Sequence, residues 1–573
     1  MELIIGIDLG TTNSTAACLT DDGPTLIANA LGLTLTPSVV GLDDGGKLLV
    51  RAAARELQVL HPQRCACLFK RHMGSEWTVK LGNRTFNPEE LSSLVLRSLK
   101  ADAEAFFRRS VNKAVITVPA YFNDRQRKAT IAAGKIAGLD VQRILNEPTA
   151  AAIAYGFHEA KQDKTLLIFD LGGGTFDVSI VEFFEGTLEV KASAGESVLG
   201  GEDFTRSMAG RLLDARKMNY ERAEAETPLL ISRLIQQCEV AKCRLSTQDS
   251  ATVRIPDRKG EFHESSEVAT VTREQLEAWV GPILNRIEMP IRRVLGDAKM
   301  TRDQIDEIIL VGGATRMPLV VRRIEELMGK SPQQRLNPDE VVSMGAAVQA
   351  GLVGKAASLV DLVVTDVAPF TLGVEISKEL GQEIRQGYFM PIIDRNTTIP
   401  VSRVNRLATI SPNQTTVRIR VFQGESRRVD DNLCLGEFEV AGIPAGPAGQ
   451  AVDVRFTYDL NGVLEVEASV VATGKRVNHV ITKYARDLTP AQIRQAVRDM
   501  EKLKVHPREE EENRFLLRRA ERLFQELGKY EREQISQLLD EFEAALSSQE
   551  PEPIETARSA LEIFLDQHDP ASQ

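Results

Sequence analysis

Two separate stretches of this sequence repeat one local pattern, and that repeat constrains the fold more than any other feature. IGIDLGTTNS and, further on, IFDLGGGTFDVS each run a short apolar segment into an aspartate, a glycine turn and a threonine. The apolar segments predict buried strands, and Asp8 and Asp170 are carried out of the apolar layer into the turns. Two similar units would place two such turns on either side of one cleft, so the sequence predicts a duplicated α/β domain.

The glycine turns indicate what this cleft would bind. Glycine accepts positive φ and has no Cβ, so backbone N–H groups in these turns can approach an anion closely. Carboxylates beside the turns would hold Mg²⁺ through water while the loops hold the phosphates of a nucleotide. Each loop taken singly could equally be a tight hairpin turn, and neither has a Walker or dinucleotide-binding pattern. The predicted loop residues are Gly10, Thr11, Thr12, Asn13, Gly172, Gly173, Gly174 and Thr175, and a third turn, Gly312 and Gly313, is expected beneath the adenosine.

Composition excludes several classes of function. The 573 residues, 43% of them hydrophobic and 26% charged, are enough for several packed domains. Lys and Arg number 70 against 81 Asp and Glu, and the net charge of −11 gives no reason to expect a nucleic acid partner. A basic leader and an apolar run of about 18 residues are both missing, so we expect a cytoplasmic protein without a membrane partner. The six cysteines lack the spacing of a zinc site and predict reduced thiols.

A set of motifs along the chain resembles the DnaK-type, seventy-kilodalton heat-shock chaperones. The motifs are IGIDLGTTNS, VPAYFNDRQRKAT, NEPTAAAIAYG, FDLGGGTFDVS, LGGEDF and LVGGATRMP, followed by NTTIP, VFQGE and DLNGVLEVEA. The short length and the linker ending in Thr-Asp are most similar to the HscC branch of this family. The resemblance implies a multidomain chain, with an actin-like duplicated ATPase domain at 1–356, an apolar linker at 357–367, an antiparallel β-sandwich substrate-binding domain at 368–486 and a shortened helical lid at 487–573.

The resemblance also implies catalytic residues. Lys70, in LFKRHMG, matches the lysine that positions the attacking water and the γ-phosphate, although from sequence alone it could be a solvated surface lysine. Glu147 and Asp170 match carboxylates that orient metal-bound water, while the alternative for Glu147 is a charge at a helix start. Positioning and charge neutralisation are sufficient for phosphoryl transfer. The remaining matches, to Mg²⁺-shell, K⁺-site and phosphate-contact residues, are Asp8, Thr11, Thr175 and Asp177.

Adenosine contacts are expected from the predicted helix LIQQCEVAKCRLS. Glu239, Lys242 and Ser246 lie at i, i+3 and i+7 and so share one face. Cys243 stands where several family members have an arginine that lies against the adenine, so the hypothesis follows that this protein retains nucleotide less tightly. By resemblance, Gly201, Arg316 and Asp339 complete the pocket, although Arg316 and Asp339 could be an ordinary exposed ion pair.

Two further features would connect this cleft with the rest of the chain. Pro119 and Arg127 match a family pair that relays between the nucleotide site and the linker, the alternative being that Pro119 simply ends a strand. The apolar run Leu362, Val363 and Val364 matches the interdomain linker, which docks on the ATPase domain in the ATP state. Thr365 replaces a common leucine there, which removes about 1 to 2 kcal/mol of apolar docking energy.

From Val367 to about Lys483 alternating apolar residues predict an antiparallel β-sandwich, with a hairpin at Asn461-Gly462. The residues that match the family's peptide pocket are Val374, Leu407, Ile410, Val417 and Ile419, although periodicity alone favours core positions for most of them. ISKELGQEIRQGYF is longer than the usual hairpin, which changes the arch over the peptide. The last segment predicts helices, beginning at a capping-box pattern at Thr489 and interrupted at Pro507, Gly528 and Pro551.

The function implied is that of an ATP-dependent chaperone. ATP hydrolysis and exchange would switch its affinity for extended apolar segments of unfolded proteins, with ATP or ADP, Mg²⁺ and K⁺ as cofactors. A J-domain co-chaperone is the implied partner, and a nucleotide exchange factor is a further candidate. The duplicated cleft is shared with sugar kinases and actin-like filament ATPases, which are the alternatives. A sugar kinase needs a general-base aspartate at a sugar pocket and has no reason to carry a peptide-binding β-module, whereas a filament needs self-complementary surfaces, which a sequence does not show.

Overall fold

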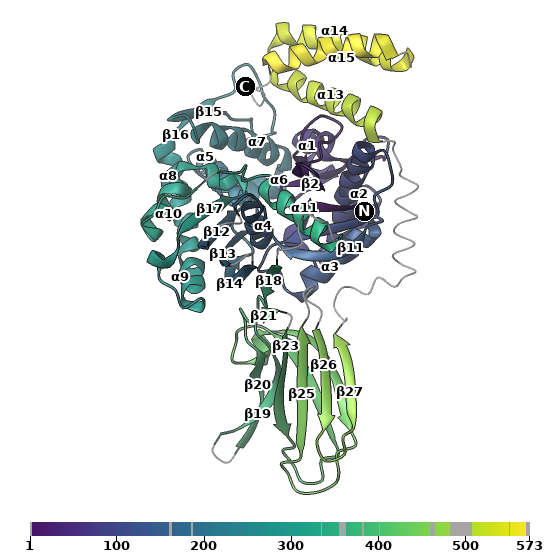
Figure 1. Ribbon diagram of the computed structural model, residues 1–573. Coiled ribbons are helices and arrows are strands. Elements are labelled where there is room, and N and C mark those ends of the chain that lie inside the picture. The colour runs from purple at the N-terminus through teal and green to yellow at the C-terminus, as the bar shows by residue number, and fades with distance from the viewer. Residues whose placement is uncertain are drawn as a thin grey trace.

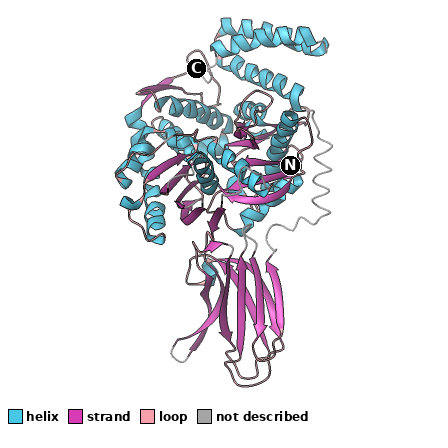
Figure 2. Ribbon diagram, viewed as in Figure 1, coloured by secondary structure: helices cyan, strands magenta, loops and turns pink. Residues whose placement is uncertain are grey.

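The structure is a computed structural model, and it describes residues 3–159, 163–184, 187–333, 335–354, 363–380, 383–399, 401–458, 464–481, 507–548 and 551–568. An α/β body contains two large sheets surrounded by helices (Figure 1; Figure 2). A β-sandwich lies at one end of this body, and three helices lie at the opposite end.

The first large sheet contains the first of the two repeated stretches. β1 (Ile4–Asp8) is its central strand and pairs in parallel with β10 (Lys113–Val118), which pairs in parallel with β11 (Asp140–Asn146). On its other side β1 is antiparallel to β2 (Asn13–Thr20), which is antiparallel to β3 (Gly23–Leu26). A short strand, β4 (Thr36–Pro37), also pairs with β2.

The second large sheet repeats this arrangement. β12 (Lys164–Leu171) is parallel to β17 (Glu307–Val311) and antiparallel to β13 (Phe176–Phe184), and β13 is antiparallel to β14 (Thr187–Glu196). β1 and β12 therefore occupy equivalent places, and Asp8 and Asp170 lie near the same end of the two strands. The edge is extended by β18 (Val363–Val367) and β21 (Thr398–Ile399), which come from beyond the α/β body in sequence.

Helices α4 (Glu147–Glu159) and α11 (Val341–Val353) pack between the sheets and against each other. The approach requires glycine, because a Cβ on Gly345 would lie 1.7 Å from the carbonyl oxygen of Ala150, and one on Gly6 would lie 2.2 Å from the backbone nitrogen of Ala347. The apolar residues of these helices and the inner faces of both sheets form one buried cluster. This packing holds the ends of β1 and β12 toward one another.

The remaining helices cover the outer faces of the two halves (Figure 2). In the first half they are α1 (Arg51–Leu60), α2 (Pro88–Phe107) and α3 (Asp124–Ile136), with small strands β5 (Val40–Leu42), β6 (Leu48–Val50), β7 (Cys65–Ala66), β8 (Val79–Leu81) and β9 (Arg84–Phe86). In the second half they are α5 (Gly201–Asp214), α6 (Tyr220–Glu226), α7 (Pro228–Leu245), α8 (Arg273–Leu284), α9 (Glu288–Asp297) and α10 (Pro318–Met328), with the hairpin β15 (Ser250–Arg254) and β16 (Val268–Thr272). All six cysteines are free thiols.

The β-sandwich consists of two four-stranded antiparallel sheets around an apolar core, as the alternating pattern predicts. One sheet contains β19 (Leu372–Leu380), β20 (Glu383–Ile393), β23 (Thr416–Gln423) and β24 (Leu433–Ala441). The other contains β22 (Val401–Ala408), β25 (Ala451–Tyr458), β26 (Leu464–Val470) and β27 (Arg476–Ile481). The turn expected at Asn461-Gly462 lies outside the described residues, although β25 and β26 pair as the two arms of that hairpin.

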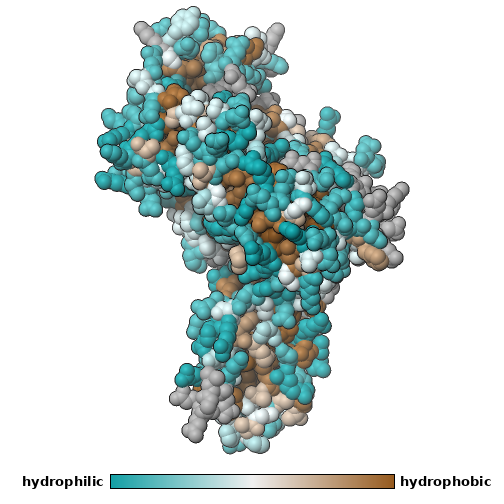
Figure 3. Space-filling view, turned by 90° about the vertical axis from the view of Figure 1, so that its left-hand side faces the viewer, coloured by the Kyte–Doolittle hydropathy of each residue, from teal (hydrophilic) through white to brown (hydrophobic). Residues whose placement is uncertain are grey.

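The C-terminal helices form a three-helix bundle with its own apolar cluster. They are α13 (Pro507–Glu526), α14 (Lys529–Ser548) and α15 (Pro551–His568), so Pro507, Gly528 and Pro551 lie at helix boundaries as predicted. The helix start expected at Thr489 lies outside the described residues. In the part of the chain that is described, no helix combines the length and apolarity needed to cross a bilayer. Hydrophilic residues predominate on the face in Figure 3, and apolar ones form small groups.

Candidate nucleotide cleft and its link to the β-sandwich

The two repeated glycine turns face each other across the α/β body. A Cβ on Gly173 would lie 2.0 Å from the hydroxyl oxygen of Thr12, and one on Gly174 would lie 2.5 Å from Cγ2 of Thr11. The hydroxyl of Thr12 is buried and has no hydrogen-bond partner among the described residues. Close backbone approach and an unsatisfied buried hydroxyl are what a phosphate-binding pair of loops would present. The first turn is held by Ser14, whose hydroxyl accepts from the backbone N–H of Gly10 at 3.1 Å.

The second turn is held by its own backbone and by the start of α5. The N–H of Gly172 donates to the carbonyl of Thr175 at 3.1 Å, and the N–H of Gly201 donates to the carbonyl of Gly172 at 3.0 Å. An arginine from the first half reaches across: Arg71 Nε donates to the carbonyl of Gly174 at 3.2 Å, and Arg71 Nη2 donates to Asp203 at 2.7 Å. Arg71 was not singled out from the sequence, yet it joins the two halves at the phosphate loops.

Lys70 is buried at the base of these loops. Only 3% of the residue is exposed, which excludes the solvated surface lysine. Its Nζ donates to Glu147 Oε1 at 2.7 Å and lies 5.6 Å from the centre of the Phe122 ring. A left-handed residue, Leu68 with φ of 56°, begins the short turn that carries Lys70 and turns the chain inward. Glu147 is the first residue of α4, so its carboxylate also lies at a helix N-terminus.

Three further carboxylates surround this ion pair. Burial, reinforced by the negative charge of Glu147, raises the pKa of Asp8 to about 7 and that of Asp177 to about 8. The same causes raise the pKa of Asp170 well above its usual range. Asp8 accepts a hydrogen bond from Thr117 Oγ1 at 3.0 Å, and Asp177 accepts one from the backbone N–H of Tyr121 at 3.2 Å. Three buried carboxylates and the half-buried Asp8 stand against one lysine, and a bound cation would neutralise this concentration of acidic groups.

The predicted adenosine residues line the other side of the second phosphate turn. Lys242 Nζ donates to Glu239 at 2.7 Å, to the carbonyl of Gly201 at 2.9 Å and to Thr205 at 2.9 Å. These bonds fasten α7 to the N-terminus of α5. Burial disfavours the charged form of both side chains, but the attraction between Glu239 and Lys242 outweighs this effect. The pKa of Glu239 is therefore lowered and that of Lys242 is raised. Ser246 caps the end of α7 one turn further along, and Cys243 Sγ lies 3.5 Å from Glu239 Oε1.

The third glycine turn follows β17, as predicted. Gly312 has φ of 82° and a Cβ there would lie 2.4 Å from the carbonyl oxygen of Leu171, so this turn packs directly on the second phosphate turn. A Cβ on Gly313 would lie 2.7 Å from Asp339 Oδ1. Arg316 Nη2 donates to Asp339 at 2.8 Å and to Asn337 at 2.6 Å, and the Arg316 and Asp339 side chains are 49% and 22% exposed. Gly312 and Lys242 are therefore linked to the second glycine turn and its neighbour Gly201 by close contacts, and Asp339 lies against Gly313.

The predicted relay residues lead from the cleft to the linker strand β18. Arg127 donates to the carbonyls of Ala120 and Phe122, at 3.1 and 3.0 Å, and so holds the loop that begins at Pro119. It also donates to Asn146 Oδ1 at 2.6 Å. Asn146 Nδ2 in turn donates to both oxygens of Asp366, at 2.8 and 2.9 Å.

Asp366 lies in the linker strand and is buried, and burial raises its pKa while the Val367 N–H, Arg127 and Arg143 oppose that rise. Asn146 directly precedes Glu147, so one short segment reaches both Lys70 and the linker.

The described part of the predicted linker, Val363–Val367, forms strand β18 and pairs with the α/β body. Val363 and Val364 pair in parallel with Thr187 and Leu188 of β14, and Thr365 pairs with Glu189. Leu362 lies outside the described residues. Thr365 Oγ1 donates to the carbonyl of Leu188 at 3.5 Å, so the residue that replaces the expected leucine keeps a polar contact with the body.

The β-sandwich makes direct contacts with the α/β body beside the linker. Arg395 donates to both oxygens of Asp297 at 2.9 Å, and Asn396 Nδ2 donates to the same carboxylate at 2.9 Å. The rings of Tyr121 and Phe370 lie 4.5 Å apart. The backbone N–H of Tyr121 donates to Asp177 of the cleft, so Tyr121 contacts both the cleft and Phe370.

The predicted peptide residues do not form a visible set in this structure. Val374 and Ile419 lie in the sandwich core with 0% and 2% exposure, and Leu407 and Val417 are partly buried against that core. Ile410 is 44% exposed. Their assignment to a peptide pocket therefore stays a prediction.

Asn146, Asp366, Arg71 and Asp203 were missed from the sequence. Asn146 and Asp366 have sequence signals in hindsight: one opens NEPTAAA and the other ends the apolar linker run. No local pattern marks Arg71, because its partners lie more than 100 residues away in the chain.

The structure shows a two-halved α/β body whose candidate nucleotide cleft is joined by strand β18 to a β-sandwich. Comparison with known proteins gives the family. The family model described as Hsp70 protein matches residues 4–80 and 76–572. Two relatives, each described as chaperone protein DnaK, come from Thermotoga petrophila and Thermotoga sp. strain RQ2. Each is 40% identical over 531 residues, which cover 91% of this chain and 87% of the relative.

The chain belongs to the Hsp70 family. It is an ATP-dependent chaperone that hydrolyses ATP, as the sequence motifs implied, and the sugar kinase and filament alternatives are set aside.

Proposed function

We propose that the nucleotide lies between the two glycine turns, with its phosphates toward Lys70 and its adenosine toward α7. The observation that carries this is the buried ion pair of Lys70 with Glu147 at 2.7 Å, next in the chain to Arg71, which bonds the second glycine turn. Lys70 would hold the attacking water and the γ-phosphate, because an ammonium in a desolvated site stabilises developing negative charge. Glu147, Asp170 and Thr175 would orient the water, and Glu239, Lys242, Ser246, Arg316 and Asp339 would surround the adenosine.

A divalent cation fits the charge of this site. Asp8, Asp170 and Asp177 supply hard oxygen donors, which Mg²⁺ prefers, and their pKa values are raised first by burial and then by the charge of Glu147. In the described ranges no three His, Cys, Asp or Glu side chains lie close enough to hold one ion directly, so we propose that the carboxylates act largely through water. Thr11 and Thr175 would contribute to a K⁺ site. The bound cations supply charge neutralisation of the phosphates.

The route from cleft to linker supports coupling between ATP and peptide. Glu147 pairs with Lys70, and its neighbour Asn146 binds Asp366 of the docked strand. A shift of this segment when the γ-phosphate is lost would withdraw hydrogen bonds from a buried carboxylate, which is costly. We propose that ATP keeps the linker docked and that hydrolysis releases it together with the Arg395–Asp297 contact. Pro119 and Arg127 would position the loop that leads from the cleft toward the linker strand.

The ligands of the β-sandwich are proposed from the family. We propose that it binds extended apolar segments of unfolded proteins at Val374, Leu407, Ile410, Val417 and Ile419, after rearrangement exposes the buried members. A J-domain co-chaperone would stimulate hydrolysis, an exchange factor is a second proposed partner, and the cytoplasm is the proposed location. The domain limits at 356, 367 and 486 and the HscC branch remain predictions from the sequence.

Single-turnover ATP hydrolysis with and without an unfolded apolar peptide tests the coupling. Asp366→Asn keeps the size of the side chain but replaces one carboxylate oxygen by an NH₂ group. This group cannot accept the hydrogen bonds that Asn146 Nδ2 and the Val367 N–H donate to Asp366. In the wild type we expect peptide to accelerate hydrolysis by about fivefold or more, the usual size of a coupling between two sites. In Asp366→Asn we expect less than about twofold acceleration, with basal hydrolysis retained.

The control for this experiment is Asp430→Asn, an exposed aspartate of the sandwich, which should behave as wild type. Full peptide stimulation in Asp366→Asn would refute the route through Asn146. Hydrolysis that ignores peptide in the wild type itself would refute the coupling altogether, while leaving the cleft assignment standing.

A further inference from the structure

The C-terminal bundle lies over the α/β body at the end opposite to the β-sandwich. In Figure 1, α13 lies above α1 of the first half and α7 of the second half. α13 packs along α1, and the same helix also makes hydrogen bonds to the second half. One rigid element thus touches both halves of the domain.

The contact with the first half is a nearly buried ion pair. Arg522 of α13 is 2% exposed, and its Nε donates to Glu56 Oε2 of α1 at 2.6 Å. Arg522 also lies 3.5 Å from Glu526, one turn further along α13. An arginine held between two carboxylates in a site with little solvent is a strong and directional contact.

The contact with the second half uses the next turn of the same helix. Arg233 of α7 is almost completely buried and donates to Gln525 of α13. Arg254, from the end of β15, donates to the backbone carbonyl of Glu526. Both arginines lie over the ring of Phe262, with distances of 5.7 and 5.1 Å from guanidinium to ring centre.

These contacts are made where the two halves meet at the opening of the nucleotide cleft. Ser232, beside Arg233, donates to the carbonyl of Gln58 on α1 at 2.8 Å, so α1 and α7 touch there. Arg55 of α1 donates to the carbonyl of Thr12, in the first phosphate turn, at 3.4 Å. Further along α7 are Glu239 and Lys242 of the adenosine side. Separating the halves to free a nucleotide would therefore move α1 and α7 apart.

We propose that the C-terminal bundle is a strap that joins α1 to α7 across the mouth of the cleft and slows nucleotide release. This inference rests on the proposed nucleotide cleft. Opening the cleft must break either the Arg522–Glu56 pair or the bonds from Arg233 and Arg254, because α13 cannot follow both halves. Breaking either side removes charge-assisted or polar hydrogen bonds from an arginine with little access to water, which adds to the barrier for release.

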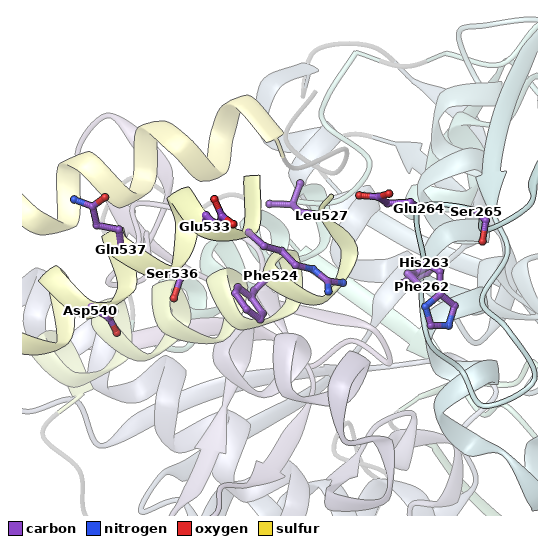
Figure 4. A pocket seen from close by; sticks show the side chains of 11 residues that line it. Phe262, His263, Glu264, Ser265, Phe524, Leu527, Glu533, Ser536, Gln537 and Asp540 are labelled. Carbon is purple, nitrogen blue, oxygen red and sulfur yellow. The ribbon is translucent and has the colours of Figure 1, made fainter. Parts of the chain in front are cut away.

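The contact surface is incompletely packed, which makes the strap reversible. A cavity of about 790 Å³ separates the loop at Phe262 from α13 and α14. Figure 4 shows Phe524 and Leu527 on one side of this space and His263 and Glu264 on the other. A few polar contacts around an open cavity hold more weakly than a continuous apolar interface, so the bundle can leave the body during the chaperone cycle.

Release of a fluorescent ADP or ATP analogue from full-length protein, chased with unlabelled nucleotide in a stopped-flow instrument, tests the strap. Glu56→Ala and Arg522→Ala should each accelerate release by about tenfold, which corresponds to about 1.4 kcal/mol. The double variant should be no faster than the faster single variant, because the two changes remove one interaction. Glu56 lies on α1, so its substitution leaves the bundle's own packing untouched.

Arg519→Ala is the matched control. Arg519 lies one turn before Arg522 in α13 but pairs with Asp566 inside the bundle, at 2.8 Å. Its variant should release nucleotide at the wild-type rate. Release within about twofold of wild type in both Glu56→Ala and Arg522→Ala would overturn the strap, as would equal acceleration in Arg519→Ala. Failure of the cleft assignment has a different signature: Glu239→Ala would then bind nucleotide as tightly as wild type.

Discussion

The nucleotide cleft and the β-sandwich are two binding regions of one chain, and they are built in opposite ways. The cleft contains a buried lysine paired with Glu147, two further buried carboxylates and the half-buried Asp8. The predicted peptide residues are aliphatic, and two of them are indistinguishable from the sandwich core that surrounds them. Buried charge therefore identifies a site from structure alone, whereas apolar residues do so only once they are exposed.

The physical reason lies in the cost of burial. A buried charged group costs several kcal/mol unless it is paired, so its presence in a core demands a function or a partner. Burial of a valine or isoleucine is favourable by about 1.5 to 3 kcal/mol and needs no further explanation. Substitutions in the cleft should therefore lower the rate of ATP hydrolysis, and substitutions in the sandwich should lower the affinity for peptide.

The largest effect is expected in the cleft. Lys70→Ala should lower the single-turnover rate of ATP hydrolysis by at least about a hundredfold, because removing one preorganised charge from a transition state costs about 2.7 to 4 kcal/mol. ATP affinity should change far less, since the phosphate turns and the adenosine side remain. Rapid-quench kinetics and equilibrium nucleotide binding measure the two quantities separately.

Lys70→Arg is the matched variant for that experiment. It keeps the positive charge beside Glu147 but replaces a compact ammonium by a planar guanidinium. We expect it to remain folded and nearly as slow as Lys70→Ala, which would show that position as well as charge is required. A near-normal rate in Lys70→Ala would remove the central residue of the proposed cleft.

A smaller effect is expected in the sandwich. Ile410→Ala should weaken binding of an apolar peptide by about fivefold, since about 1 kcal/mol of apolar contact is lost. The free energy of unfolding should hardly change, because Ile410 is already 44% exposed. Fluorescence anisotropy of a labelled peptide and thermal melting give the two results.

Val404→Ala provides the comparison for Ile410. Val404 is 43% exposed on β22 of the same sandwich but is not among the predicted peptide residues. It should leave peptide affinity unchanged. Equal loss of affinity in the two variants would mean that general surface apolarity, and not a pocket at Ile410, determines binding.

The sequence predicted the duplicated sheets and the cleft because the local pattern contained their physical causes. Asp8 and Asp170 lie at or near the ends of apolar strands, and the glycines that follow them are required by close contacts such as that of Gly173 with the side chain of Thr12. The helix boundaries at Gly528 and Pro551 were likewise readable, because these residues end or begin helices for local reasons.

The remaining features depend on contacts between distant parts of the chain. Asp366 binds Asn146 from 220 residues away, and Arg522 reaches Glu56 across 466 residues. No periodicity or turn signal encodes such a pair. The peptide residues were named by resemblance, and the structure leaves them untested because Val374 and Ile419 are buried in the present arrangement.

The smallest effect is expected at Cys243, an exposed residue on the proposed adenosine side of the cleft. Burial and the neighbouring Glu239 raise the pKa of the Cys243 thiol to about 11, so this residue is neutral at pH 7. Cys243→Arg adds a cation that can stack on the adenine, an interaction of about 0.5 to 1 kcal/mol at an exposed site. We expect nucleotide release to slow by about two- to fivefold.

Cys243→Ser separates stacking from the loss of the thiol and should release nucleotide at the wild-type rate. The new arginine also has a competing partner, because Cys243 Sγ lies 3.5 Å from Glu239 Oε1. If Arg at this position paired with Glu239 instead of the base, it would draw that carboxylate away from Lys242 and release would become faster. A slower rate therefore supports an adenine at this edge of α7, and a faster rate places the base elsewhere.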